Sequence, residues 1–258
     1  PSDIKEGKIE LIADIDGVLK IRRDALVAVN SLGEMMIASR HGDFPVKVGD
    51  KLAGTRIIPL VIEKEKMERA KEICNDGSIL EIKPLQPKKA AILTTGSEVY
   101  HGRITDKFTP VVKAKLEEAG MEVLGNVLCD DDSQMVTDAI NDWIGKGAEF
   151  VVCTGGMSVD PDDRTPLSIR NATDEVITYG APVLPGAMFM LAYKGEIPVA
   201  GLPGCVMYAR RTIFDLVLPR IAAGERLSVE DFTVLGEGGL CLNCKVCTFP
   251  NCGFGKGW

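Results

Sequence analysis

The feature that most constrains the fold is a regular alternation of short apolar runs and amphipathic segments, which begins at Ala90. The apolar runs predict strands, which we place at 90–95, 121–127, 148–153 and 197–202. The amphipathic segments predict helices, which we place at 106–119, 133–146 and 206–223. Because parallel connections have to cross over the sheet, this order predicts an α/β fold whose mostly parallel sheet is covered by helices on both faces.

Residues 1–88 follow a different pattern, which predicts a small β-rich domain. Runs of β-branched and aliphatic residues between turn residues predict strands at 9–15, 18–21, 34–38 and 55–62, with a strand–turn–strand at 46–52. A helix is predicted at 63–76. The polar segment 83–89, which two prolines interrupt, predicts a linker. We therefore expect a second domain over 89–230 and a cysteine-rich tail over 231–258.

Charge and hydropathy exclude several classes of partner. The formal net charge is -7, so the field of the protein repels nucleic acid and anionic membranes, and we expect neither as a partner. No apolar run approaches the roughly 20 residues that a membrane-spanning helix needs. Scattered cysteines in apolar stretches, such as Cys129 and Cys153, indicate reduced thiols and a cytoplasmic location. Because the chain begins at Pro1, we expect it to be a trimmed part of a longer protein.

Three glycine-bearing turns follow predicted strands of the α/β domain. They contain Gly96, Gly155-Gly156 and Gly204. In such sheets ligands bind beyond the carboxyl ends of the strands, so these turns are expected at one edge. Glycine lets the backbone approach a ligand, and N–H groups together with Ser and Thr hydroxyls suit phosphate or another oxyanion. One such turn alone is typical of ordinary loops, whereas the three together predict a ligand site.

Carboxylates follow the same strands and are candidates for chemistry. Glu98 follows the first turn, Asp131 follows the second strand, and Asp163 follows the Gly-Gly turn. Carboxylates beside a phosphate site indicate a bridging Mg²⁺ ion, because Mg²⁺ prefers oxygen ligands and substrate phosphates. Asp132 immediately precedes a predicted helix and is expected to cap it.

The loop sequences resemble those of the molybdenum-cofactor biosynthesis (molybdopterin-binding) domain family. The first motif is Thr95-Gly96-Ser97-Glu98-Val99, followed by Gly102-Arg103-Ile104-Thr105-Asp106. The second is Thr154-Gly155-Gly156-Met157-Ser158-Val159, followed by Asp163 and Thr165, and Gly201-Leu202-Pro203-Gly204 is similar to a later family turn. The resemblance covers about 135 residues in the right order. It implies a three-layer αβα fold that binds molybdopterin in a homo-oligomer.

The resemblance also implies roles for individual residues. The family's functional carboxylates correspond to Glu98, Asp131 and Asp163, which are our candidate catalytic residues. The expected ligand-binding residues are Thr95, Gly96, Ser97, Thr154, Gly155, Gly156, Met157, Ser158, Pro203 and Gly204. The molybdopterin molybdotransferase branch of the family would insert molybdate into adenylylated molybdopterin with Mg²⁺. We therefore expect a transferase of molybdenum cofactor biosynthesis, with free or adenylylated molybdopterin and molybdate as partners.

Two departures from the family pattern keep other functions open. Cys205-Val206 stands where the family usually has Asn-Pro. Asp160-Pro161-Asp162-Asp163 is closer to the competence-damage-inducible branch, whose domains resemble nucleotide pyrophosphatases. The alternatives are thus a nucleotide pyrophosphatase and a non-catalytic, redox-sensing protein that binds the cofactor.

The tail carries four cysteines in the pattern C-x₂-C-x₂-C-x₄-C. They are Cys241, Cys244, Cys247 and Cys252. Disulfides fit poorly, because neighbouring pairs would be strained and the compartment is expected to be reducing. Four thiolates so close in sequence predict metal binding, either of an iron–sulfur cluster or of Zn²⁺. A cluster of thiols without metal is the remaining alternative.

Overall fold

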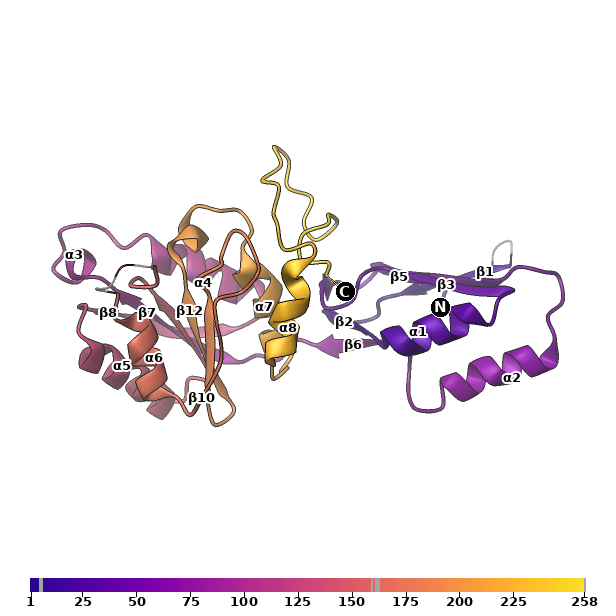
Figure 1. Cartoon of the computed structure of the whole chain (residues 1–258), viewed down its shortest axis with the longest axis horizontal. Coiled ribbons are helices and arrows are strands. Elements are labelled where there is room, and N and C mark those ends of the chain that lie inside the picture. The colour runs from indigo at the N-terminus through magenta and orange to yellow at the C-terminus, as the bar shows by residue number, and fades with distance from the viewer. Residues whose placement is uncertain (5–6, 159, 161–162, 258) are drawn as a thin grey trace. The chain divides into compact units, whose positions relative to one another are not determined.

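The computed structural model describes residues 1–4, 7–158, 160 and 163–257 (Figure 1). The chain divides into two compact units, Pro1–Leu85 and Gln86–Trp258. The last strand of the first unit, β6 (Leu80–Pro84), ends one residue before this division. Part of the segment that we predicted to be a linker is therefore a strand, and the connection between the units is shorter than expected.

The first unit is β-rich, as predicted, and contains two three-stranded antiparallel sheets with the orders β1-β5-β3 and β4-β2-β6. Its elements are β1 (Lys8–Ile12), β2 (Gly17–Ile21), α1 (Arg23–Ser31), β3 (Met35–Ser39), β4 (Pro45–Val46), β5 (Lys51–Ile57), α2 (Lys64–Ile73) and β6. Helix α1 was not predicted, although Ala25 and Val29 are spaced to bury one helical face. The strand predicted at 55–62 was wrong in its second half, because β5 ends at Ile57.

The second unit contains a six-stranded sheet with the order β10-β11-β12-β9-β7-β8. Four neighbouring strands are parallel, and all four were predicted: β12 (Ile197–Leu202), β9 (Phe150–Thr154), β7 (Lys89–Thr95) and β8 (Glu122–Cys129). The antiparallel strands β10 (Glu175–Tyr179) and β11 (Met190–Lys194) extend the sheet beyond β12 and were not predicted. The sheet is thus mostly parallel.

Helices cover both faces of this sheet, which gives the expected three-layer αβα architecture. The remaining elements are α3 (Ser97–Tyr100), α4 (Phe108–Glu118), α5 (Ser133–Gly145), α6 (Thr165–Ala172), η1 (Gly204–Met207), α7 (Ile213–Ala222), α8 (Val229–Thr233) and η2 (Val234–Gly236). On one face, Ile140 of α5 and Ile169 of α6 pack in a fully buried cluster with Leu93 of β7. The alternate side chains of β7 face the other layer, where α4 packs against this strand.

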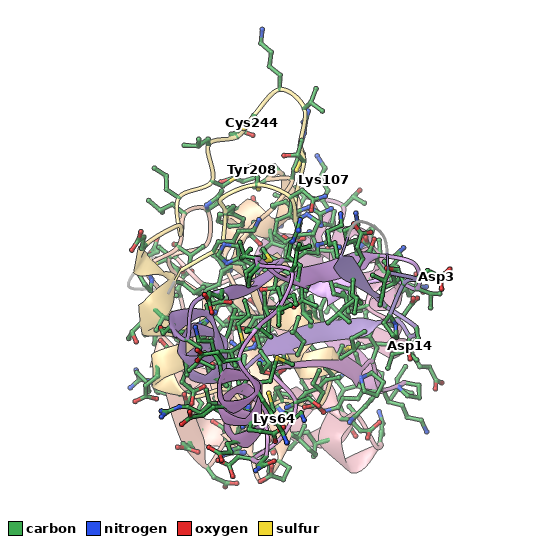
Figure 2. The ribbon with its side chains drawn as sticks, turned by 90° about the vertical axis from the view of Figure 1, so that its right-hand side faces the viewer. Asp3, Asp14, Lys64, Lys107, Tyr208 and Cys244 are labelled. Carbon is green, nitrogen blue, oxygen red and sulfur yellow. The ribbon has the colours of Figure 1, made fainter. Side chains whose placement is uncertain are left out.

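The C-terminal part of the second unit departs from prediction. A single helix was predicted at 206–223, but the chain forms η1 first and begins α7 only at Ile213. Thr212 caps α7 in a reciprocal arrangement with Asp215, which explains why the helix begins there. Beyond Leu240, the described part of the tail contains neither helix nor strand and forms a projecting loop that carries Cys244 (Figures 1 and 2).

Within the described residues, no helix is long and apolar enough to cross a membrane.

Candidate functional site

The loops that carry the predicted site residues meet at one edge of the sheet, because their strands are parallel. Thr94 of β7 lies opposite Thr154 of β9, and Leu202 of β12 lies on the other side of Thr154. Thr95 lies opposite Cys129, the last residue of β8. The four loops after β7, β8, β9 and β12 therefore begin next to one another, as the sequence predicts.

Buried threonine hydroxyls join the ends of these strands. The Thr95 hydroxyl donates to the carbonyl of Thr154 at 3.3 Å and lies 3.0 Å from the hydroxyl of Thr165, the first residue of α6. The hydroxyl of Thr154 donates to that of Thr94 at 3.1 Å. All four side chains are nearly inaccessible to solvent. The network therefore fixes the floor of the site and leaves ligand contacts to the residues above it.

Steric crowding explains the two glycines after β9. Gly155 and Gly156 have φ values of +83° and +55°, in the region that L side chains rarely adopt. A Cβ atom at Gly155 would lie 2.1 Å from the carbonyl oxygen of Thr95, and one at Gly156 would lie 2.7 Å from the hydroxyl of Thr165. The glycines are thus required for the loop to pass over the threonine network, whatever their role toward a ligand.

Two of the predicted catalytic carboxylates hold serine-bearing loops in place. Asp131 accepts a hydrogen bond from the backbone N–H of Ser97 at 2.9 Å. Asp163 accepts one from the backbone N–H of Ser158 at 2.5 Å. Each carboxylate is therefore a positioning group for one loop at the edge.

Asp130 was not predicted as a site residue, but it connects the first two loops. The pKa of its carboxyl lies below the ordinary value, mainly because the backbone N–H of Asp131 donates to it, with further contributions from Ser97 and His101. The Nε2 atom of His101 lies 3.2 Å from the carboxylate. A charged carboxylate in this position orders the loop after β8 against α3.

The remaining predicted residues differ in how they are placed. Glu98 is exposed on α3, and Asp132 caps α5 by accepting from the N–H of Met135, as predicted. The Met157 side chain is only 3% exposed and lies in the hydrophobic core, whereas Gly204 is exposed at the start of η1. Among the described residues, no three acidic, histidine or cysteine side chains are grouped so that they could hold a metal ion.

A cavity of about 520 Å³ opens beside the Gly-Gly loop. It is lined by Ser158, Asp160, Asp163, Pro166, Leu167, Arg170, Tyr179 and Met188. The Arg170 guanidinium lies 5.9 Å from the ring centroid of Tyr179 and contributes positive charge to a cavity that also contains two carboxylates. Neither residue was predicted, because α6 and β10 were not; Pro166 near the start of α6 is the sequence signal that was available. Val159, Pro161 and Asp162, which the sequence motifs include, lie outside the described residues.

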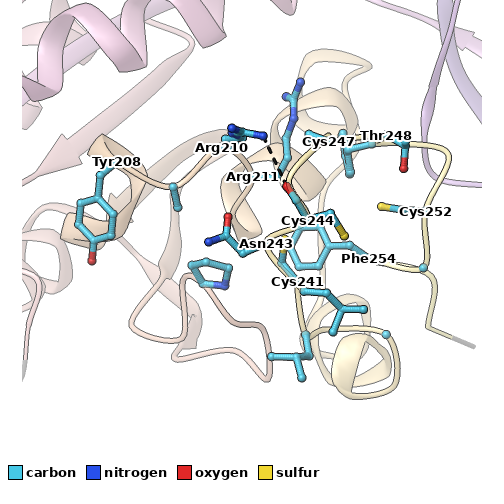
Figure 3. Close-up of a pocket in the computed structure, with 17 residues that line it drawn as sticks. Tyr208, Arg210, Arg211, Cys241, Asn243, Cys244, Cys247, Thr248, Cys252 and Phe254 are labelled. Carbon is cyan, nitrogen blue, oxygen red and sulfur yellow. Dashed lines mark hydrogen bonds between the residues drawn. The ribbon is translucent and has the colours of Figure 1, made fainter.

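The four tail cysteines line a second cavity, of about 400 Å³ (Figure 3). Cys244 and Cys247 are exposed, Cys241 and Cys252 are partly buried, and all four are free thiols. Arg210 and Arg211, which lie between η1 and α7, contribute the cationic side of the cavity. The structure thus brings the four predicted metal ligands to one cavity, although no three of them are close enough to hold a single ion within the described part of the chain.

Comparison with known proteins gives one family match. A family model described as a probable molybdopterin binding domain matches residues 91–223, just over half of the chain. A CinA-like protein of Pseudothermotoga lettingae is 33% identical over 85 residues, which cover 33% of this chain and 21% of that protein. A molybdenum cofactor biosynthesis bifunctional protein of Chlorobaculum tepidum is 29% identical over 144 residues, or 52% of this chain and 46% of that protein. The chain therefore spans less than half of each of these curated relatives.

The chain is also similar to solved structures. The molybdopterin biosynthesis enzyme MoaB of Thermus thermophilus matches with a TM-score of 0.47 and 22% identity over 54% of this chain and 98% of that one. The tungsten cofactor synthesizing protein MoaB of Pyrococcus furiosus matches with a TM-score of 0.42 and 21% identity, over 52% and 88% of the two chains.

Proposed function

Because the chain belongs to the family of probable molybdopterin binding domains, we propose that its α/β unit binds molybdopterin and takes part in molybdenum cofactor biosynthesis. The observation that carries this proposal is the cavity beside the Gly-Gly loop, into which a cation, an aromatic ring and a serine converge at the predicted sheet edge. Cavities of this size are typical of small-molecule sites.

The residues of the cavity suit the chemical groups of a pterin phosphate. We assign the phosphate to the guanidinium of Arg170, because a fork of N–H donors matches phosphate oxygens. The ring of Tyr179 offers a flat surface for the pterin. Ser158 provides a hydroxyl, and Asp163 fixes its backbone. The carboxylates of Asp160 and Asp163 would repel a phosphate that approached them directly, so the phosphate is expected to lie on the arginine side.

The finer proposal is that the protein inserts molybdate into adenylylated molybdopterin. Glu98, Asp131 and Asp163 remain the candidate catalytic residues. A Mg²⁺ ion would be held by Asp131 or Asp163 together with substrate phosphate oxygens, since Mg²⁺ commonly takes only one or two protein carboxylates. It would neutralise phosphate charge when bound. The protein's own contribution is to orient the loops of Ser97 and Ser158 and to hold the phosphate.

Calorimetric titration of the full chain with molybdopterin under anaerobic conditions tests the binding proposal. We expect saturable binding with one site per chain. Arg170→Gln should weaken it, whereas Arg226→Gln, which also removes an arginine stacked on a tyrosine ring, should leave it unchanged. The absence of binding would contradict the proposed function. Adding adenylylated molybdopterin, molybdate and Mg²⁺ then tests turnover, which Asp131→Ala or Asp163→Ala should abolish if the transferase proposal is correct.

Nucleotide pyrophosphate hydrolysis is the second candidate, because the relatives include several CinA-like proteins and the Asp160–Asp163 loop resembles their branch. A dinucleotide incubated with the protein and Mg²⁺ or Mn²⁺ distinguishes the two functions. Cleavage without pterin binding would favour the pyrophosphatase. Pterin binding without cleavage under any divalent cation would eliminate it.

A further inference from the structure

The cysteine tail is a feature of the second unit that the proposed function leaves unexplained. The chain enters it through an isolated bridge between Leu184 and Leu240, in which the N–H of Cys241 donates to the carbonyl of Leu184 at 2.8 Å. Beyond this bridge the described tail residues form neither helix nor strand. A segment with so little backbone pairing has few interactions of its own that could order it.

Contacts with the α/β unit nevertheless shape the tail around a cavity. The guanidinium of Arg210 donates to the carbonyl of Cys244 at 3.5 Å (Figure 3) and to that of Lys245 at 2.9 Å. The guanidinium of Arg211 lies 4.9 Å from the ring centroid of Phe249. The rings of Phe249 and Phe254 are 6.2 Å apart. In Figure 3 the Cys252 thiol points from the far side of the tail back across the cavity toward Cys244. The loop is therefore folded back on itself, with its cysteines facing a common space.

The size of this space favours a ligand larger than one ion. A tetrahedral zinc site needs four sulfurs at about 2.3 Å from one point. Here the four cysteines line about 400 Å³, and no three of them converge on one position. An iron–sulfur cluster places a body of several atoms between its thiolates, which matches cysteines spread around the wall of a cavity.

The charged and apolar side chains around the cavity also suit an iron–sulfur cluster. Four thiolates bring excess negative charge to the cluster, and Arg210 and Arg211 lie beside it. The Arg211 guanidinium, which donates to the Asp215 carboxylate at 2.9 Å, places a positive charge beside the cysteines. Leu240, Phe249 and Phe254 form the apolar side of the wall, which limits access of water to a cluster.

We propose that this cavity holds a [4Fe–4S] cluster ligated by Cys241, Cys244, Cys247 and Cys252. Each thiol loses its proton on ligation and binds one iron. Assembly of the [4Fe–4S]²⁺ state takes two ferrous ions, two ferric ions and four sulfides from solution and releases the thiol protons, so no further oxidant is needed. The sequence pattern C-x₂-C-x₂-C is that of bacterial iron–sulfur runs, and the fourth cysteine completes the set. The site is independent of the pterin cavity, because the two cavities share no lining residue.

Anaerobic reconstitution of the full chain with ferrous iron, ferric iron and sulfide, without pterin, tests the proposal. We expect about four iron atoms and four sulfides per chain, broad visible absorption, and an electron paramagnetic resonance signal after reduction with dithionite. Cys244→Ser should lose most of the iron, and Cys74→Ser, which changes an exposed cysteine of the first unit, should retain it. Circular dichroism of both variants checks that they are folded.

Three results would overturn the proposal: no iron uptake by the folded chain under these conditions, a disulfide between tail cysteines that persists in reductant, or full iron content in folded Cys244→Ser. Because no pterin is present in this experiment, a failure of the cluster proposal is distinguishable from a failure of the proposed function.

Discussion

The carboxylate of Asp163 accepts the backbone N–H of Ser158 and closes the loop after β9 on itself. Asp131 makes the corresponding contact with Ser97 after β7, although 34 residues separate the two in sequence. Both aspartates thus accept the backbone N–H of a serine at the sheet edge, Asp163 within one loop and Asp131 between two loops. Each aspartate holds a serine-bearing loop in place, whether or not it also takes part in catalysis. Substitutions therefore have to distinguish the positioning of the loop from the chemical role of the carboxylate.

Replacing Asp163 by asparagine and by alanine separates position from charge. Asparagine can still accept the N–H of Ser158, so Asp163→Asn should keep molybdopterin affinity within about threefold, whereas Asp163→Ala should weaken it about tenfold, in line with one lost hydrogen bond. If Asp163 acts in catalysis, Asp163→Asn should still abolish molybdate insertion. Titration calorimetry and turnover measure the two effects. Asp142→Asn, on the exposed face of α5, is the matched control and should change neither.

Gly156→Ala should destabilise the loop and weaken pterin binding. The new Cβ would lie 2.7 Å from the Thr165 hydroxyl, and φ is +55°, so we expect a loss of about 1–3 kcal/mol in the free energy of unfolding. Adding Thr165→Ala removes the clash but not the backbone strain, and should recover part of the loss. Gly145→Ala, in α5 where nothing lies within 4 Å of the new Cβ, should be neutral or stabilising. Chemical denaturation measures all three, and equal effects of Gly145→Ala and Gly156→Ala would contradict the steric argument.

Arg170→Gln should weaken molybdopterin binding about 10- to 100-fold, the range expected for charge-assisted hydrogen bonds to phosphate. Affinity for the dephosphorylated pterin should change much less, because the lost interaction is with the phosphate. Titration of both ligands provides the comparison. An equal loss for the two would place the phosphate elsewhere.

Asp215→Ala should strongly destabilise the second unit. The Asp215 side chain is 4% exposed and accepts from Lys115 of α4 at 2.5 Å and from Arg211 at 2.9 Å, while it also caps α7. Its removal takes the carboxylate partner away from two part-buried cations, and we expect a loss of about 3–5 kcal/mol in the free energy of unfolding. Glu117→Ala, which breaks an exposed pair with Lys113, should cost less than about 1 kcal/mol. Thermal denaturation compares the two variants.

Thiol labelling at pH 8 should divide the cysteines into two classes. Burial raises the pKa of Cys129 to about 11 and that of Cys153 further, so both remain protonated at pH 8 and should not react in the folded protein. Cys74 and Cys244 are exposed and should react. Iron–sulfur reconstitution should protect Cys244 while Cys74 stays reactive. Mass spectrometry of alkylated peptides measures this, and labelling of Cys153 without denaturant would contradict the buried core.

The sequence allowed the parallel part of the sheet to be predicted, because its strands are apolar runs separated by helices of clear periodicity. The hairpin β10–β11 and helix α6 were not predicted. Helix α6 has only eight residues, and buried and exposed side chains alternate only weakly along β10. In both elements the local sequence pattern is too weak to identify the secondary structure, which tertiary packing decides. As a result, Arg170 and Tyr179, which these two elements contribute, were absent from the predicted site.

The candidate site was predictable only where short loops follow parallel strands. Because β7 and β9 are parallel neighbours, the loops after them bring Thr95, Thr154 and the two glycines together, as expected. The glycines are required because their backbone passes close to Thr95 and Thr165. This close approach depends on tertiary packing, which the periodicity of the sequence does not encode. The cysteine spacing similarly predicted the four tail cysteines as candidate ligands. That Arg210 and Arg211 line the same cavity could not be predicted, because it depends on the break between η1 and α7.

The division at Leu85 has a consequence for how the protein melts. Each unit buries a core of its own, around Leu19 and Val29 in the first and around Leu93 and Ile140 in the second. A scanning calorimeter should therefore record two heat-absorption peaks, of which the one from the smaller unit carries less enthalpy. Loading the tail with iron should move only the larger peak, so one calorimetric trace would report separately on the unit that contains both proposed sites and on the unit for which no role is proposed.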